Sequence, residues 1–412
     1  MGKIVVLGGC GAVGRHSVKT LADSKEVDKV IIADINLELA KEMAENLGEK
    51  VSAVKVDAHD IKSIRNAIQG ADVVVNTIGP YYIFEKKILE TVIEEVINYV
   101  DVCDDTGATY DALALDEKAK EKGVTALIGM GSSPGITNVL AAFAATTKSI
   151  MAECESIDLF HIHGGEPVEG VGVIGHRFYC MKQDVPMFID GKMLNLTQKE
   201  SEAHTEEIKF INIEGKHKVY PYPHPEPITM PKWIPGVKRV TNKGTVLPEE
   251  YYNLTRTIFG AGMDSRAPIT VNGVPVIPHD FATQFLIKRR DEILKETNFG
   301  EQRGCVKIVV SGKNERGLDR KYIFYLVSEG AGKGQAMGEG TGIPCALGAL
   351  LMLKGKIKNG PGVLPPEACV DAMEFLSLMR KIMKVDGNDE SKKSPLIIHK
   401  IDEKGNIEVI DI

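Results

Sequence analysis

The sequence predicts an α/β protein with two main parts, an N-terminal doubly wound parallel sheet and a second domain richer in strands. Short apolar runs alternate with helix-periodic segments up to about Ser133, as is typical of a parallel sheet covered by helices on both faces. After Ser133 the chain carries more strand-like runs and turn residues. Right-handed crossovers would make the first part doubly wound, and 412 residues suffice for two or three domains.

Six apolar runs of the first part are predicted to be buried strands: KIVVLG, KVIIADIN, SAVKVDA, ADVVVNTIGP, YVDVCDD and VTALIGMG. Apolar residues at helical spacing follow the first five of these runs, at Ala12–Leu21, Leu39–Leu47, Ile61–Ile68, Phe84–Ile97 and Leu113–Ala119. Asn36 is a suitable N-cap for the second of these helices. Strand and helix therefore alternate regularly.

The second part begins with a helix in GITNVLAAFAATT. VKIVVSGKNERGLDRKYIFYLV predicts a β-hairpin, and PLIIHKIDEKGNIEVIDI predicts a final one. The segment 219–236 holds six prolines, so we expect a loop or an edge segment that could shield an active site. VIGHRFYCMK is strand-like, whereas TGIPCALGALLMLKG and PPEACVDAMEFLSLMRKIM each predict a helix.

Composition excludes several classes of protein. Apolar residues make up 43% of the chain and charged residues 26%, as in ordinary globular proteins. The net charge of −7 argues against nucleic acid or anionic membrane as a main partner. No run is long enough for a transmembrane helix, and the N-terminus has no apolar signal region, so we expect a cytoplasmic protein.

Cysteine and histidine usage predicts no metal site. The seven cysteines form no CxxC pair and their number is odd, which is typical of scattered reduced thiols. His161 and His163 alternate in LFHIHGG and would share one face of a strand. No further ligands lie at useful spacing, so we predict that this face is polar or meets a substrate.

The glycine-rich stretch VVLGGCGAVG predicts a dinucleotide site. Gly9-x-Gly11-x-x-Gly14 lies between a strand and a helix, which is the arrangement of the Rossmann fingerprint. Gly11 would let the backbone approach a pyrophosphate, and Gly14 would let helix and strand pack closely. Ala12 and Val13 open the helix, whose free N–H groups favour an anion. The alternative is a Rossmann-like domain that binds no nucleotide.

An acidic residue predicts which dinucleotide is preferred. Asp34 lies twenty residues after Gly14, at the end of the second strand, and Ile35 follows it. A carboxylate there can accept hydrogen bonds from the adenosine ribose and would repel the 2′-phosphate of NADP. No arginine follows directly, so the sequence favours NAD over NADP.

The ends of other strands should meet the same crevice, because ligands of open parallel sheets bind beyond the carboxyl ends of the strands. Asp57 and Ala58 end the third strand and would lie near the adenine. The fourth strand ends in small residues with room for the nicotinamide ribose, and a plain strand-ending turn is the alternative. These residues are Thr77, Ile78, Gly79 and Pro80. Asp101 ends the fifth strand and is a further candidate cofactor contact.

The combined motifs resemble the saccharopine dehydrogenase superfamily, which includes saccharopine reductases, lysine 6-dehydrogenases and carboxynorspermidine synthases. The motifs are GGCGAVG, NTIGPYY, YVDVCDD, GMGSSPGITNVLA, EGTGIPCALGALLMLKG and GVLPPEACVDAMEFL. They span nearly the whole chain. The resemblance implies a Rossmann domain over 1–132, completed by helices within about 341–385. It also implies a substrate and dimerisation domain over 133–340 with a mixed sheet, and we assign 386–412 to the final hairpin.

The resemblance further implies hydride transfer at a CH–NH carbon of an amino acid or an amino-acid-derived imine, with a lysine dehydrogenase-like activity favoured. One motif differs. Saccharopine reductases resemble one another in a GLDPG segment whose aspartate is thought to act near the reacting amine, and Ser133 occupies that place here. This difference argues against saccharopine itself. A condensing enzyme of the homospermidine synthase kind and a non-catalytic NAD-binding protein are the alternatives.

Amine oxidation requires a base and a site for the substrate. We predict Asp104 and Asp105 as the catalytic carboxylates, since neighbouring negative charges raise one pKa toward the working pH. The alternative is that one of them caps the next helix. Asn138 could bind nicotinamide or substrate, or could instead cap its helix, and Tyr81 is a further substrate candidate.

A substrate carboxylate favours a bidentate arginine. Four arginines of the second domain are candidates, namely Arg177, Arg239, Arg256 and Arg266. We favour Arg177, because it lies in a run that we place at the interdomain side. The apolar run in PCALGALLMLKG and the second-domain sheet exceed what one small domain buries, so a homodimer is also predicted.

Overall fold

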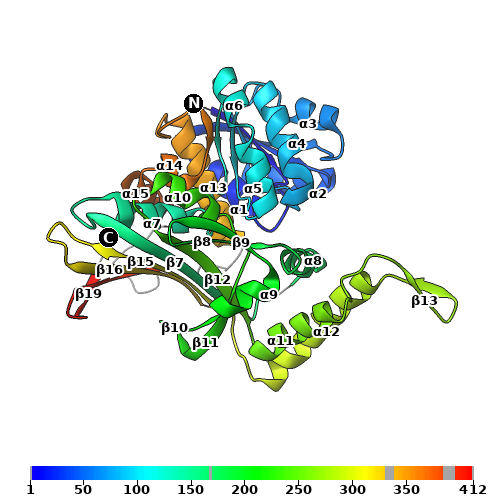
Figure 1. The fold of residues 1–412 in the computed structure, drawn as a ribbon. Helices are drawn as coiled ribbons and strands as arrows, with labels where there is room; N and C mark the ends of the chain where they lie inside the picture. Colours follow the sequence, from blue (N-terminus) through cyan, green and yellow to red (C-terminus); the bar gives the residue numbers. More distant parts are fainter. Residues whose placement is uncertain (1, 167–168, 330–337, 384–394, 411–412) are drawn as a thin grey trace.

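A computed structural model describes residues 2–166, 169–329, 338–383 and 395–410. It contains one seven-stranded parallel sheet and one ten-stranded mixed sheet. In Figure 1 the first sheet and its helices form the upper body and the second sheet lies below. The predicted α/β class with a doubly wound first sheet is therefore confirmed.

The first sheet has the strand order β17-β6-β5-β4-β1-β2-β3. Six strands are those predicted: β1 (Gly2–Leu7), β2 (Val27–Asp34), β3 (Val51–Lys55), β4 (Val73–Asn76), β5 (Asn98–Asp101) and β6 (Thr125–Leu127). The seventh strand, β17 (Gly362–Leu364), was not predicted, because three residues are too few to show periodicity. It pairs in parallel with β6 and so brings the C-terminal part of the chain back to the first domain.

Helices connect these strands as expected, with one exception. They are α1 (Gly14–Asp23), α2 (Leu37–Leu47), α3 (Ile61–Ile68), α4 (Tyr81–Glu94), α5 (Thr106–Leu113) and α6 (Asp116–Lys122). Asn36 caps α2 as predicted, and its side chain accepts the N–H of Leu39. The single helix expected around Leu113–Ala119 is wrong, because α5 ends at Leu113 and α6 begins at Asp116, whose position is suited to an acidic first turn.

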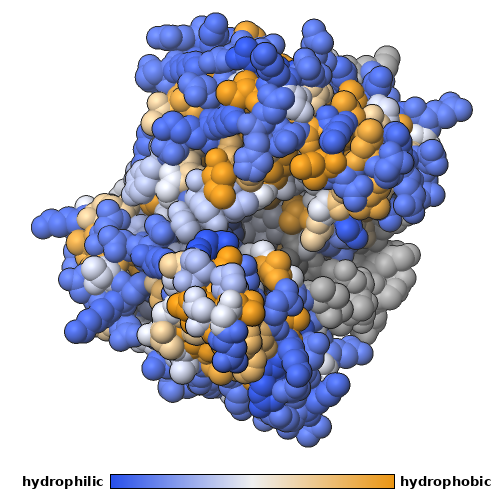
Figure 2. All heavy atoms as spheres, turned by 90° about the vertical axis from the view of Figure 1, so that its right-hand side faces the viewer, coloured by the Kyte–Doolittle hydropathy of each residue, from blue (hydrophilic) through white to orange (hydrophobic). Residues whose placement is uncertain are grey.

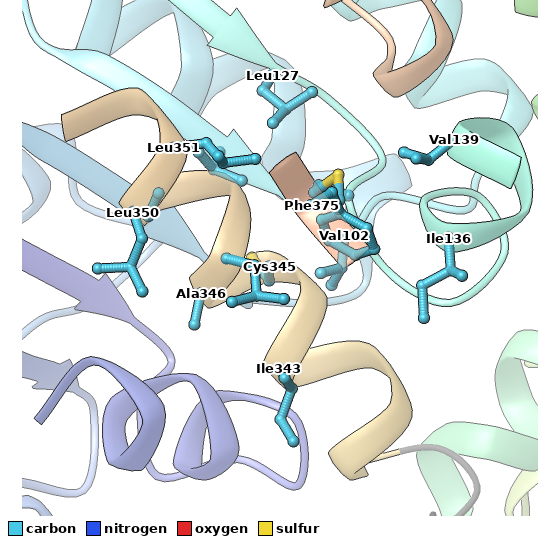
Figure 3. Packing of buried hydrophobic residues seen from close by; sticks show 14 of the residues in the cluster. Val102, Leu127, Ile136, Val139, Ile343, Cys345, Ala346, Leu350, Leu351 and Phe375 are labelled. Atoms are coloured by element: carbon cyan, nitrogen blue, oxygen red, sulfur yellow. The ribbon is translucent and has the colours of Figure 1, made fainter. Parts of the chain in front are cut away.

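Helix α13 (Gly338–Leu353) packs against α1, β4 and β5 of the first domain. Figure 3 shows its residues Ile343, Cys345, Ala346, Leu350 and Leu351 among Leu127, Phe375 and Val139. Gly342 allows this approach, since a Cβ there would lie 2.4 Å from the carbonyl oxygen of Val13. The apolar run that suggested an oligomer is thus buried inside one chain, so it gives no support to the predicted homodimer.

The second sheet has the order β10-β11-β12-β7-β15-β16-β18-β19, and β8 pairs with β12 and β9. Its strands are β7 (Glu153–Gly164), β8 (Val185–Ile189), β9 (Lys192–Leu196), β10 (Glu206–Phe210), β11 (Ile213–Pro221), β12 (Arg239–Leu247), β15 (Arg303–Lys313), β16 (Asp319–Glu329), β18 (Leu396–Ile401) and β19 (Ile407–Ile410). The β15–β16 and β18–β19 hairpins confirm both predicted hairpins. The parallel pairing of β12 with β7 makes the sheet mixed.

Two predictions for the second part are wrong, and a third is confirmed. The strand-like run around Arg177 is a helix, α8 (Val171–Cys180), because Ile174 and Phe178 are both buried at helical spacing. The single helix predicted after Pro365 is two, α14 (Pro366–Cys369) and α15 (Ala372–Met383). The helix α7 (Ile136–Thr146) confirms the one predicted in GITNVLAAFAATT.

The proline-rich segment 219–236 is more regular than predicted. Its first residues belong to β11, which lies between β10 and β12 and is not an edge strand. Residues Glu226–Trp233 form a helix, α10. Pro227 is tolerated there because the first turn of a helix needs no N–H donor, and Pro231 costs one hydrogen bond near the end of a short helix.

An arm projects from the second domain (Figure 1). It consists of α11 (Glu249–Gly260), a hairpin of β13 (Ile269–Val271) and β14 (Val274–Val276), and α12 (Pro278–Glu296). Short elements α9 (Gln198–Ser201) and η1 (Glu202–His204) complete the domain. Among the described residues, no helix is long and apolar enough to cross a membrane.

Candidate active site

The glycine loop after β1 has the close contacts that its spacing predicts. A Cβ on Gly14 would lie 2.3 Å from the carbonyl oxygen of Gly8, and a Cβ on Gly9 would lie 2.9 Å from Ile32. Gly11 and Ala12 are exposed. Within the described parts of the chain, no hydrogen bond uses the N–H groups of Ala12, Val13 or Gly14. The start of α1 is therefore open to an anion.

Asp34 lies beside this loop. Its two carboxylate oxygens accept the N–H groups of Cys10 and Asn36, each at 3.0 Å. Burial and the charge of Asp34 raise the pKa of the Cys10 thiol to about 11. Ile35 is exposed next to it. The carboxylate of Asp34 is thus held at the end of β2, as its predicted contact with the adenosine ribose requires.

The ends of β3 and β4 lie on the same edge of the sheet. Asp57 accepts the N–H of His59 at 2.9 Å, and Ala58 is half-buried beside it. The hydroxyl of Thr77 donates to the carbonyl oxygen of Leu7 at 2.8 Å, which ties the end of β4 to the glycine loop. Ile78 and Pro80 are partly exposed and Gly79 is exposed, so this turn leaves open surface beside the loop.

Asp101 lies underneath that edge. It is 0% exposed, and its Oδ1 accepts the N–H groups of Cys103 and Gly129 at 2.9 and 2.6 Å. Burial and the charge of Asp101 raise the pKa of nearby Glu85 well above its usual range. The hydroxyl of Tyr81 donates to the carbonyl oxygen of Asn76 at 3.3 Å. Asp101 therefore shapes the turns around the crevice and has no surface open to a ligand.

A cavity of about 320 Å³ lies between the two domains. Val102, Asp104 and the turn Gly131–Ser133 contribute one wall from the first domain. Residues of β7, β12, β15 and β16 form its floor, and α8 and the start of α13 close its sides. The cavity lies beyond the carboxyl ends of β5 and β6, where ligands of such sheets bind.

The two predicted catalytic carboxylates are separated by the fold. Asp105 is 3% exposed, and its side chain accepts the N–H of Ala108 at 2.8 Å, so it caps α5. Asp104 lines the cavity, and its Oδ2 lies 3.7 Å from Nε2 of His176. Burial alone would lower the pKa of His176, but the charge of Asp104 and contact with the Cys180 thiol raise it to about 10. Only Asp104 is placed to meet a substrate.

Asn138 is buried away from the cavity. Its side-chain oxygen accepts the N–H of Gly135 at 3.1 Å, and its amide donates to Glu367 at 2.7 Å. It therefore holds the turn before α7 and links this helix to α14. The capping role that we weighed against ligand binding is the one that the structure places there.

Arg177 lines the cavity from α8, as its proposed role in substrate binding requires. Its Nη2 donates to Glu169 at 2.6 Å, and Tyr251 donates to the same carboxylate at 2.5 Å. Its Nη1 is buried and has no hydrogen-bond partner among the described residues. One nitrogen of the guanidinium group is thus fixed by Glu169, whereas the other keeps its capacity to donate a hydrogen bond.

The other candidate arginines lie outside the cavity. Arg239 pairs with Asp158 at 2.8 Å, Arg256 pairs with Glu202 at 3.1 Å, and Arg266 lies 3.4 Å from His279. Each of these three arginines therefore has a partner within the protein and does not border the cavity.

Sequence reasoning missed four residues of this site: His176, Tyr222, His224 and Glu226. His161 and His163, which we predicted to share a strand face, both line the cavity from β7. The alternation of His and Tyr with Pro around Tyr222 and His224 was the available signal. We interpreted that segment as shielding, because prolines hide the strand period.

Comparisons with known proteins show which family the chain resembles. The saccharopine dehydrogenase NADP binding domain matches residues 4–127, and the saccharopine dehydrogenase C-terminal domain matches residues 131–385. The chain is 25% identical over 390 residues to the carboxyaminopropylagmatine dehydrogenase of Synechocystis sp., covering 87% of this chain and 91% of that protein. It is 24% identical over 416 residues to the carboxynorspermidine synthase of Vibrio cholerae, covering 92% and 96%.

Two solved structures share the fold. Apo saccharopine dehydrogenase (L-Glu forming) from Saccharomyces cerevisiae has a TM-score of 0.68 at 17% identity, covering 92% of this chain and 97% of that one. The homospermidine synthase from Legionella pneumophila, solved in complex with NAD, has a TM-score of 0.55 at 12% identity, covering 100% and 91%. These likenesses agree with the two-domain architecture.

Proposed function

The chain belongs to the saccharopine dehydrogenase family of NAD(P)-dependent oxidoreductases acting on CH–NH substrates, and we propose that its own substrate is a carboxylated amine of the polyamine kind. The observation that carries this proposal is the presence of opposite charges in the lining of one cavity. Arg177, whose Nη1 has no hydrogen-bond partner among the described residues, and Asp104 both line it.

The residues around the glycine loop fit a dinucleotide. Side chains at Gly9 and Gly14 would collide with the neighbouring backbone or core, and the N–H groups at the start of α1 have no described partner. The loop with Gly11, Ala12 and Val13 would hold the pyrophosphate, and Asp34 would meet the adenosine ribose. The adenine would lie near Asp57 and Ala58, and the nicotinamide ribose would lie near the turn Thr77–Pro80. When bound, the dinucleotide supplies or accepts the hydride.

We further propose that NAD is preferred over NADP. The carboxylate of Asp34 is held in place by two backbone N–H groups, so it cannot easily turn away from a 2′-phosphate. Arg15 is the nearest basic residue along this loop, and it donates instead to the carbonyl oxygens of Cys10 and Gly11. A negative group at that position is the usual basis of NAD selectivity.

Two charged side chains that line the cavity suit the two charged groups of a carboxylated amine. Arg177 would bind the carboxylate through Nη1, while Glu169 holds its other nitrogen. Asp104 would hold a cationic nitrogen, and His176 beside it limits how far that carboxylate can move. Apolar side chains that also line the cavity, such as Val102, Ile136 and Val246, suit a methylene chain.

The names of the relatives support this substrate class over lysine. Both the Synechocystis and the Vibrio protein are named for carboxylated polyamines, and each aligns over nearly its full length. We therefore propose a carboxylated polyamine as the substrate in place of lysine, which the sequence had favoured.

The test is an assay of amine oxidation by the full chain. Carboxynorspermidine, carboxyaminopropylagmatine, saccharopine and lysine would each be offered with NAD⁺ and with NADP⁺, and reduced dinucleotide would be followed by absorbance. We expect the highest kcat/KM with a carboxylated polyamine and many turnovers per chain. Highest activity with lysine, or a single turnover per chain, would contradict the proposal.

A further inference from the structure

A second pair of imidazole and carboxylate lies at the cavity, formed by His224 and Glu226. Nδ1 of His224 lies 2.6 Å from Oε2 of Glu226. His224 lines the cavity, whereas Glu226 is 0% exposed at the start of α10. Neither residue is used by the substrate contacts described above, although both are titratable groups in the interior.

Glu226 is held as a carboxylate by donors from several elements. Oε1 accepts the hydroxyl of Ser133 at 2.6 Å and lies 3.4 Å from the hydroxyl of Thr137, while Oε2 accepts the amide of Asn242 at 3.2 Å. Burial alone would raise the pKa of Glu226, but the charge of His224 and these hydrogen bonds lower it. A buried ionised carboxylate with this many donors is rigid as well as charged.

The bond to Glu226 determines which nitrogen of His224 faces outward. Nδ1 donates to the carboxylate, and within the described chain nothing hydrogen-bonds Nε2. The groups around the ring are Glu226 from α10, His161 from β7, His176 from α8, Asp104 after β5, and Tyr222 beside it in the chain. The nitrogen that meets the cavity can therefore carry a proton toward a ligand.

Two of these surrounding groups, Glu226 and Asp104, favour the cationic form of His224, whereas the charge of His176 opposes it. Burial alone would lower its pKa, but the charge and hydrogen bond of Glu226 and the charge of Asp104 raise it. His161 differs, since burial and the charge of His224 lower its pKa to about 3. Of these two neighbouring rings, His224 is thus the one whose surroundings favour a proton, whereas the surroundings of His161 disfavour one.

We propose that His224 is the catalytic residue that exchanges a proton with the substrate nitrogen, and that Glu226 is its positioning residue. This inference rests on the proposed function. In the direction of reduction, the N–H bond at Nε2 breaks and a new N–H bond forms on the substrate nitrogen. The carbon of the C=N bond gains hydride from the reduced dinucleotide, so the product is the secondary amine and His224 is left neutral.

His176 is less suited to this task. Its Nε2 lies 3.7 Å from Asp104 and 3.4 Å from the sulfur of Cys180, so that nitrogen already has partners. His176 therefore stays paired with Asp104, whereas the pair of His224 and Glu226 transfers a proton. A carboxylate that orients a histidine through Nδ1 and leaves Nε2 for the reactant is a recurrent arrangement in catalysis.

The first test compares His224→Gln, Glu226→Gln and His161→Gln by steady-state kinetics of reduction across pH 5 to 10. We expect His224→Gln to lower kcat by about 10²- to 10⁴-fold with unchanged dinucleotide binding. Activity should fall as pH rises through the pKa of His224, and Glu226→Gln should move this fall to lower pH by about one unit or more. His161→Gln is the control at a neighbouring histidine, and it should leave the pH at which activity falls unchanged.

Full kcat in His224→Gln, or an unmoved pH profile in Glu226→Gln, would overturn the inference. A second measurement does not depend on the substrate. Titration of the His224 ring by NMR should give a higher pKa in the wild-type chain than in Glu226→Gln, and equal values would also overturn it. If the wild-type chain oxidises no carboxylated amine while this NMR difference is found, the proposed substrate fails and the pair stands.

Discussion

Asp104 and Asp105 are adjacent in the sequence, yet their carboxylates serve different structures. Asp105 turns inward and accepts the N–H of Ala108 at 2.8 Å, whereas Asp104 faces the cavity with Oδ2 3.7 Å from Nε2 of His176. One carboxylate therefore stabilises a helix and the other is available to a substrate.

This separation predicts different results for matched substitutions. Asp104→Asn should lower kcat/KM by about 10²-fold or more, since a charge-assisted contact to a cationic nitrogen is lost. Asp105→Asn should retain nearly full activity, because asparagine caps helices as well as aspartate does. Both would be assayed with the best substrate, and equal loss in the two variants would contradict the assignment. Asp105→Ala should lower the free energy of unfolding by about 1 kcal/mol.

The preference for NAD should depend on the charge at position 34. Asp34→Asn keeps an oxygen that can accept a backbone N–H but removes the negative charge. We expect NADP to bind to this variant at least about 10-fold more tightly than it binds to the wild type, which corresponds to about 1–3 kcal/mol of binding free energy. Titration of the protein with each dinucleotide checks this. If the wild-type protein binds NADP as tightly as NAD, the predicted preference is wrong.

The free nitrogen of Arg177 should matter for binding more than for turnover. Arg177→Lys keeps a positive charge but loses the fork that contacts Glu169 and, in our proposal, would contact the substrate as well. We expect KM for the carboxylated substrate to rise about 10- to 100-fold, the scale of a charged hydrogen bond of about 1.5–3 kcal/mol. Arg256→Lys is the control, since Arg256 pairs with Glu202 outside the cavity. A similar rise in KM in both variants would count against a substrate role.

Glu367 should make stability depend on pH. Burial raises its pKa from 4.5 to about 7, despite the hydrogen bond from Asn138. A carboxyl with a higher pKa in the folded state stabilises the fold below pH 4.5, and this contribution is lost as pH rises toward 7. Glu367→Gln, which stays neutral, should therefore be more stable than the wild type at pH 8 but not at pH 4.5. Urea unfolding at both values checks this, and an equal difference at the two values would contradict it.

The arm offers a better basis for the expected homodimer than the buried α13 run. In the register of the hairpin Ile269 lies opposite Val276 and Val271 opposite Val274, so one face is apolar, and Phe281 of α12 is exposed nearby. In Figure 2, where the arm points toward the viewer, apolar surface lies on it among hydrophilic residues. An isolated two-stranded hairpin is marginally stable in water, so a second copy of the chain is expected to cover this face.

Substitutions on the two faces of the hairpin test this expectation. Light scattering at micromolar concentration should give a dimeric mass for the wild type and for Thr270→Asp, which lies on the opposite face. The double variant Val271→Asp, Val274→Asp should give a monomeric mass, because it places charge on the apolar face. A monomeric wild type, or a dimeric double variant, would contradict this assembly.

Local patterns determined the first domain and its loop. The strand, GxGxxG and helix order of residues 2–23 and the helix at Ile61–Ile68 follow from periodicity and turn residues, whose preferences act within a few residues. Patterns failed where packing decides. The run around Arg177 holds β-branched and aromatic residues, but burial of Ile174 and Phe178 against α11 and α12 makes it a helix.

The roles of the site residues depended on partners far away in the chain. Nothing in the sequence near Asp105 shows that it caps a helix while Asp104 lines the cavity. The carboxylate of Glu226 is likewise held by Ser133 and Asn242, which lie in other parts of the chain. The sequence by itself determined the fold class, the dinucleotide loop and the family. Only the tertiary structure decided which charged groups meet in the cavity, because hydrogen bonds and burial between distant segments leave no local period to read.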